Sequence, residues 1–125
     1  MYSKELLARF LEPGRVGDLL SPSAVATQGN PACGDVVQIG IEVTEGSIRE
    51  ARFRTRGCAV AIAASDAVCE LATGRSLTAA EMLDAEEVAA ALGGVPRERD
   101  ACVVAPLGAL RSALRQLRHG EDPIR

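Results

Sequence analysis

A chain of 125 residues, 47% hydrophobic and 25% charged, has the composition of an ordinary globular protein and can bury a core without disulfide staples. With 2% aromatic residues and a net charge of −3, it lacks the stacking side chains and the basic surface that nucleic-acid binding requires. The charged start has no apolar signal core, and no apolar run reaches the roughly 18 residues that span a bilayer, so we expect a cytoplasmic protein without a membrane partner.

The beginning of the chain predicts a short helix and then a loose segment. Apolar residues recur at helical spacing over residues 3–11, and Pro13-Gly14 ends that helix. The residues that follow, up to about residue 30, are rich in Gly, Ser and Pro. Within them we expect a short edge strand around residues 24–27.

Two strands follow in the middle of the chain. Apolar and polar residues alternate over residues 37–43, which is typical of a half-buried strand, and again over residues 48–55. The intervening Glu45-Gly46-Ser47 supplies a turn, so the pair should form an antiparallel hairpin.

The second half of the chain predicts helices. Residues 58–73 are Ala-rich and end at Gly74, a suitable C-terminal cap. The sequences TAAE at 78–81 and DAEE at 84–87 resemble capping boxes and predict two short helices. A final helix over residues 101–118 should bury a face made of Val104, Leu107, Leu110, Leu114 and Leu117.

Strands followed by helices indicate an α+β fold, with a small antiparallel sheet of about three strands packed against several helices. We expect one domain over residues 1–125, with frayed tails at 1–4 and 119–125.

Three of the four cysteines lie at boundaries between predicted elements. Cys33 lies in a turn before a strand, Cys58 follows a strand and begins a helix, and Cys102 begins the last helix. Backbone N–H groups and the positive end of the helix dipole favour a thiolate at a helix N-terminus. Because the compartment should be reducing, metal binding or reactivity is a better interpretation than disulfides.

Asp35 adds a carboxylate to this set. It follows Cys33 by two residues, and residues at that spacing face the same side of an extended segment, so both could bind one metal. Spacing alone leaves an alternative open, since free cysteines are commonly buried as small hydrophobes and no CxxC pair is present. For Cys69, three helical turns beyond Cys58, core packing is the favoured interpretation.

Several segments resemble one family of proteins. NPACGD at residues 30–35 and RGCAVAIAAS at 56–65 resemble the first and second cysteine motifs of the IscU/NifU-type scaffolds. Cys102 before an amphipathic helix resembles the third motif, and FLEPGRVGDL at 10–19 resembles the N-terminal segment of the family. The resemblance covers nearly the whole chain, from about residue 5 to residue 118.

The resemblance implies a scaffold for iron–sulfur cluster assembly, a carrier rather than an enzyme. Such scaffolds accept sulfur from a cysteine desulfurase as a persulfide, combine it with iron and pass a transient [2Fe–2S] cluster to apo iron–sulfur proteins. The implied ligands are Cys33, Asp35, Cys58 and Cys102, with Cys102 as the persulfide acceptor. Thiolates suit iron–sulfur clusters, whereas a carboxylate is a weaker ligand, so we expect a surface site that releases its cluster easily.

The sequence departs from this family at one ligand position. IscU-type members carry a histidine directly before the third cysteine, where this chain has Ala101, and the only histidine is His119 near the end. Zinc-containing SufU-type relatives also lack that histidine and have an arginine at the position of Arg99, but they carry an insertion absent here. The family's chaperone-recognition segment would fall at residues 95–99, where this chain has VPRER. This sequence gives little support for binding of a dedicated chaperone.

These departures keep two alternative functions open. The first is a SufU-like sulfur acceptor that holds Zn²⁺ in its resting form and stimulates a desulfurase without building clusters. Tetrahedral zinc would accept three thiolates and a carboxylate. The second is a degenerate homologue that only docks on partners, against which the intact cysteine and aspartate set argues.

Overall fold

The computed structural model describes residues 2–31 and 34–120, with side chains as far as residue 118. Its strands form one antiparallel sheet in the order β1-β2-β3. In chain order the elements are α1 (Lys4–Leu11), β1 (Ala24–Asn30), β2 (Asp35–Thr44), β3 (Ser47–Arg56), α2 (Ala59–Ala72), α3 (Leu77–Glu81), α4 (Ala85–Ala91), the 3₁₀ helix η1 (Arg97–Arg99) and α5 (Ala101–Gly120). The expected α+β fold is confirmed.

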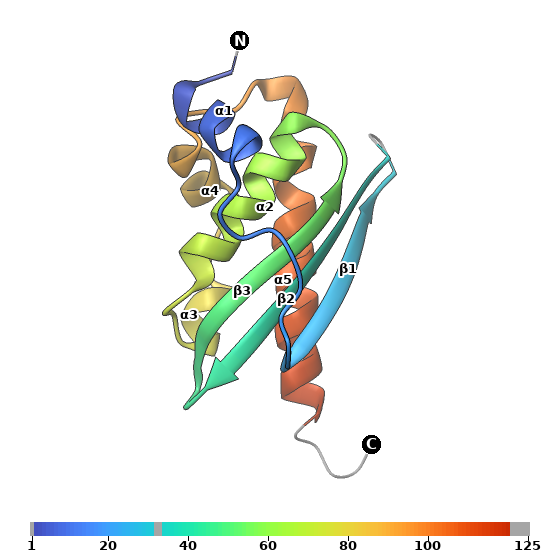
Figure 1. Cartoon of the computed structure of the whole chain (residues 1–125), viewed down its shortest axis with the longest axis vertical. Helices are drawn as coiled ribbons and strands as arrows, with labels where there is room; N and C mark the ends of the chain where they lie inside the picture. Colours follow the sequence, from blue (N-terminus) through green and yellow to red (C-terminus); the bar gives the residue numbers. More distant parts are fainter. Residues whose placement is uncertain (1, 32–33, 121–125) are drawn as a thin grey trace.

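The helices form a layer against the sheet (Figure 1). Helix α5 packs on β1 and β2, α2 packs on β3 and beside α5, and α1 packs on α2. The core lies between these layers. Among the described residues, no helix is both long and apolar enough to cross a membrane.

The predicted hairpin of β2 and β3 is confirmed, and both strands are longer than expected. Alternate side chains of β2 (Val37, Ile39 and Ile41) are fully buried, as the period of two requires. Glu45 and Gly46 both have positive φ, 54° and 78°, as tight hairpin turns demand. This hairpin fixes the register that brings the start of β2 beside the end of β3.

Strand β1 extends further than the short edge strand expected around residues 24–27. It pairs with β2 in continuous register from Ala24 opposite Ile41 to Asn30 opposite Asp35. Its last residues are polar or glycine, so side-chain alternation alone could not reveal them. Backbone pairing with β2 decides their conformation instead.

Helix α2 is nearly all buried, as its Ala-rich sequence predicts. Small side chains let it lie close to both β3 and α5, and Cys58 is its N-cap residue. Gly74, with a φ of 92°, follows the helix end at Thr73 as expected.

The apolar face expected for α5 is wrong at one position. Val104 is 57% exposed, whereas Cys102 and Val103 before it are buried. The buried stripe runs from Val103 to Leu107, Leu110 and Leu114, at spacings of four, three and four residues. Val104 lies about 100° around the helix from Val103, which places it toward solvent.

The expected capping boxes have different outcomes. Asp84 caps α4 and forms a complete box with Glu87, so this prediction is confirmed. The box predicted to start at Thr78 is wrong, because Ser76 caps α3 by accepting a hydrogen bond from the N–H of Ala79. Ser76 stands earlier in the chain and already satisfies one of the N-terminal donors, which leaves Thr78 inside the helix.

The expected limits of the tails also need correction. Ser3 caps α1 by accepting a hydrogen bond from the N–H of Leu6, and the helix begins at Lys4, so residues 3 and 4 are not frayed. At the other end, α5 continues to Gly120, beyond the expected limit at residue 118.

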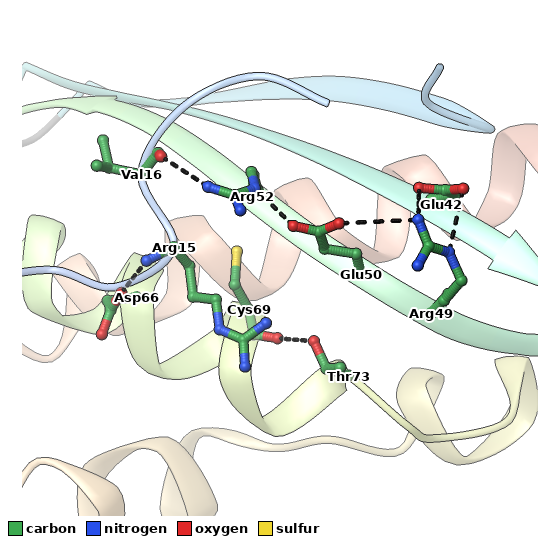
Figure 2. Close-up of polar contacts among 9 residues, drawn as sticks. All are labelled: Arg15, Val16, Glu42, Arg49, Glu50, Arg52, Asp66, Cys69 and Thr73. Carbon is green, nitrogen blue, oxygen red and sulfur yellow. Dashed lines mark hydrogen bonds and ion pairs between the residues drawn. The ribbon is translucent and has the colours of Figure 1, made fainter. Parts of the chain in front are cut away.

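A polar strap, residues 12–17, crosses α2 and β3 (Figure 2). The N–H of Arg15 donates to the buried carboxylate of Asp66 over 2.9 Å, and the N–H of Gly17 donates to the carbonyl of Phe53 over 2.8 Å. Arg52 on β3 donates to the carbonyl of Val16. The strap therefore ties the N-terminal segment to both the sheet and the helix layer.

Cys69 lies inside this part of the core, as predicted. Its side chain is fully buried, and burial in apolar surroundings raises the pKa of the thiol well above its usual value. It therefore stays protonated and unreactive at neutral pH, which separates it from the cysteines at the element boundaries.

We predict that Cys69→Ala leaves metal binding unchanged and lowers the free energy of unfolding by about 1 kcal/mol, because it removes one buried atom from the core. Urea denaturation and Zn²⁺ titration of the same preparation would measure both effects. Loss of metal binding in a variant that still unfolds cooperatively would contradict this assignment.

Candidate metal centre

Three of the residues singled out from the sequence converge in the structure. The carboxylate of Asp35 and the sulfurs of Cys58 and Cys102 supply ligand atoms that all lie within 4.8 Å of one another. The Sγ atoms of Cys58 and Cys102 are 3.4 Å apart. One cation in contact with all three groups therefore fits this geometry.

Each ligand comes from the end of a different element. Asp35 is the first residue of β2, Cys58 is the N-cap of α2, and Cys102 lies in the first turn of α5. Pairing of β2 with β3 brings the first two residues together, and packing of α5 on α2 and β2 adds the third. The site thus depends on tertiary packing more than on any local motif.

The carboxylate of Asp35 is buried, and only one of its two oxygens accepts a hydrogen bond from the described residues. The residue is 2% exposed, and Oδ1 accepts a hydrogen bond from the N–H of Cys58 over 3.3 Å. Oδ2 is buried without a hydrogen-bond partner among the described residues. A buried, unpaired carboxylate oxygen is costly unless a cation compensates it, so this atom fits the role of a metal ligand.

The site is less open than the sequence suggested. Cys102 is fully buried, because it lies on the inner face of α5, and only Cys58 among the three converging residues is partly exposed. The expectation of a surface site is therefore wrong for Asp35 and Cys102. Access to these two ligands therefore requires movement of the chain around them.

The remaining expected ligand, Cys33, lies outside the described residues, so its place in the set stays a prediction. The reason given for pairing it with Asp35 was an extended backbone, and that reason is wrong. Gly34 has a φ of 73°, and its N–H donates to the carbonyl of Asn30 over 2.7 Å, so the chain turns directly before β2.

The positions that differ from IscU-type sequences can also be placed. Ala101 is an exposed residue at the start of α5 and offers no ligand, and Arg99 lies in η1 just before it. The side chain of His119 lies outside the described part of the chain. Within the described residues, the converging donors are two thiols and one carboxylate.

Sequence reasoning missed one residue next to this site. Gly57 precedes Cys58, and a side chain there would collide with the Asp35 carboxylate. The sequence marks Gly57 only as the point where the strand pattern ends. A glycine at a strand end opposite a site carboxylate is the signal that could have identified it.

Comparison with known proteins finds relatives of the chain among iron–sulfur cluster assembly proteins. The sequence model of a family described as the NifU-like N terminal domain matches residues 1–121. The chain is 35% identical over 122 residues to the iron-sulfur cluster assembly scaffold protein IscU of Azotobacter vinelandii, covering 94% of each chain. It is 39% identical over 114 residues to IscU 1 of Archaeoglobus fulgidus, covering 91% of this chain and 74% of that protein.

Solved structures share the fold. A SufU protein of Fervidobacterium islandicum, described as a putative scaffold for the SUF system, superimposes with a TM-score of 0.77 at 21% identity, covering 90% of this chain and 96% of that one. The N-terminal part of a NifU-like protein of Brucella abortus gives a TM-score of 0.74 at 21% identity, covering 94% of both chains. These similarities support the fold alone.

We predict that the metal-free protein forms a disulfide between Cys58 and Cys102 when treated with diamide, which takes up the two electrons and two protons that the thiols release. Their sulfurs are already 3.4 Å apart, so little movement is needed. Peptide mapping by mass spectrometry would identify the bond. Bound Zn²⁺ should protect both thiols, and a disulfide to Cys69 instead would contradict the geometry.

Proposed function

The chain belongs to the family of NifU-like N-terminal domains, and we propose that it uses Asp35, Cys58 and Cys102, with Cys33, to hold a [2Fe–2S] cluster as cargo. Its function is that of a scaffold for iron–sulfur cluster assembly. In our proposal it accepts sulfur from a cysteine desulfurase, combines that sulfur with iron and passes the cluster to apo iron–sulfur proteins in the cytoplasm.

One observation supports the ligand assignment above all others. The carboxylate of Asp35, whose buried Oδ2 has no hydrogen-bond partner in the described chain, lies in a cluster with the thiols of Cys58 and Cys102. A hydrogen-bonded structural aspartate would have both oxygens satisfied. An unsatisfied carboxylate beside two thiols matches a site that is completed by iron or another cation.

The donor set also fits a cluster that must leave. Thiolates bind iron–sulfur clusters strongly, whereas a carboxylate oxygen is a harder and weaker ligand. Asp35 would therefore be the ligand that a recipient's thiolate displaces first. A protein that keeps its cluster for electron transfer gains nothing from such a ligand, but a scaffold does.

For sulfur acceptance we propose Cys102, with one structural condition. Its side chain is fully buried, so a persulfide can reach it only when the chain around the site moves. The described part of the chain contains a partly exposed thiol, Cys58, at the same site. We treat this step as carriage of sulfur rather than enzymatic turnover.

A second candidate function is a zinc-containing sulfur acceptor of SufU type. Two thiols and one carboxylate oxygen converge, and Cys33 would complete the four donors of a tetrahedral zinc site. The lack of a histidine at Ala101, which SufU-type relatives share, favours this alternative, whereas the lack of the SufU-type insertion disfavours it. Zinc would then keep the thiols unoxidised and orient them for sulfur transfer.

The test of the proposal is anaerobic reconstitution. The purified protein is incubated with ferrous iron, cysteine and a cysteine desulfurase while the visible spectrum is recorded. Single Cys→Ser variants at Cys33, Cys58 and Cys102 are treated identically, and Cys69→Ala serves as the control. We expect sulfur-to-iron charge-transfer bands in the wild type and the control, and their loss in the other variants.

The other outcomes of this experiment separate the alternatives. A protein that gives no bands, retains about one zinc per chain and stimulates the desulfurase would be a sulfur acceptor. A protein with no bands, no metal and no stimulation would be a docking module. Either outcome would contradict the cluster-holding site proposed here.

We predict that Asp35→Ala lengthens the lifetime of a bound cluster several-fold, because it removes the oxygen ligand at which an incoming thiolate enters most easily. Decay of the charge-transfer bands during transfer to an apo-ferredoxin would measure it. A variant that loses its cluster faster than the wild type would show that this role of Asp35 is wrong.

A further inference from the structure

Gly57 lies where the side chain of Asp35 crosses the end of the sheet. Val36 pairs with Arg56 in the β2–β3 ladder, so the next position along each strand sets Asp35 beside Gly57. From there the Asp35 carboxylate reaches the N–H of Cys58 over 3.3 Å. The carboxylate therefore lies over the position of residue 57.

Space is the reason that this position must be glycine. A Cβ atom at Gly57 would lie 2.3 Å from Oδ1 of Asp35 and 2.8 Å from its Cγ, far inside an ordinary contact. The φ of Gly57 is outside the left-handed range that favours glycine, so backbone conformation does not require it. Residue 57 must therefore be glycine because the Asp35 carboxylate occupies the space that a side chain would need.

Gly29 offers a comparison within the same sheet. It lies in β1, its φ is also outside the left-handed range, and a Cβ there would meet nothing within 4 Å. An alanine at Gly29 is thus a matched glycine-to-alanine change in a strand without the steric conflict. The conflict at Gly57 is specific to the Asp35 carboxylate.

We propose that Gly57 is a positioning residue for the ligand Asp35. Without a side chain at residue 57, the carboxylate lies against the backbone and beside the two thiols, accepts the N–H of Cys58 through Oδ1 and keeps Oδ2 free of hydrogen bonds from the described residues. This inference rests on the proposed function, because it concerns how one ligand of that site is held.

Gly57→Ala should therefore act through Asp35. The new methyl group forces the carboxylate to move by roughly an ångström to regain an ordinary contact. Because Asp35 is buried, such a move means a different rotamer, which breaks the hydrogen bond to Cys58 and takes the carboxylate away from the thiols. The variant then resembles a protein without the aspartate ligand.

The experiment measures Zn²⁺ affinity by chelator competition in five proteins: the wild type, Gly57→Ala, Asp35→Ala, the double variant and the control Gly29→Ala. We expect Gly57→Ala to lower the Zn²⁺ affinity about 10- to 100-fold, which is the usual effect of changing a residue that orients a metal ligand. Gly29→Ala should leave the affinity unchanged. The double variant should match Asp35→Ala within about twofold, because the two changes act on one ligand.

Two results would overturn the inference. The first is a Gly57→Ala protein with wild-type affinity. The second is a double variant much weaker than Asp35→Ala, since residue 57 would then act on something other than the aspartate. If Gly57→Ala alone does not fold, the double variant should fold again, because Asp35→Ala removes the colliding oxygens and leaves only a Cβ at 3.1 Å. Failure of both to fold would also overturn it.

A failure of the proposed function is distinguishable from these results. If the wild type binds neither Zn²⁺ nor a cluster, the site assignment fails whatever residue 57 does. A crystal structure of metal-free Gly57→Ala then decides the positioning role by itself. We expect the contact between Asp35 Oδ1 and the N–H of Cys58 to be lost, and its retention at the present distance would refute the role.

Discussion

A carboxylate that is 2% exposed loses most of its hydration, and hydrogen bonds or a cation must compensate that loss. Among the described residues, Asp35 receives one hydrogen bond, from the N–H of Cys58, and its carboxylate lies beside two thiols with the second oxygen unsatisfied. The rest of the site follows from this constraint. The sheet holds the aspartate, Gly57 makes room for it, and the helix N-termini bring the sulfurs to it.

The packing of the regular elements is enough to bring the three ligands together. The β2–β3 hairpin fixes Asp35 relative to Cys58, and the Ala-rich α2 lets α5 approach closely enough to bring Cys102 within 3.4 Å of the Cys58 sulfur. Elsewhere the strap over Asp66 joins the N-terminal segment to both layers. The ligands thus lie on the ends of regular elements, where small displacements could open the site without unfolding the core.

Local sequence patterns predicted much of this fold, because strand alternation and helix capping depend on residues close together in the chain. Alternation predicted the hairpin, and the box at Asp84 and Glu87 predicted the start of α4. The exposed Val104 was missed because distant contacts decide which face of α5 is buried, whereas the box at Thr78 was missed because Ser76 nearby offers an earlier cap. The candidate ligands were found by resemblance to known motifs. The burial of Cys102 was not predictable from spacing, because it depends on which face of α5 meets the other layers.

The central claim is that the oxygen of Asp35 and the sulfurs of the cysteines are ligands of the same iron–sulfur cluster. X-ray absorption at the iron edge, recorded on the reconstituted protein and on Asp35→Ala, tests it most directly. The account predicts a mixed first shell of sulfur with a smaller oxygen contribution, and the loss of that oxygen contribution in the variant. A shell of sulfur alone in the wild type, or identical spectra for the two proteins, would contradict it.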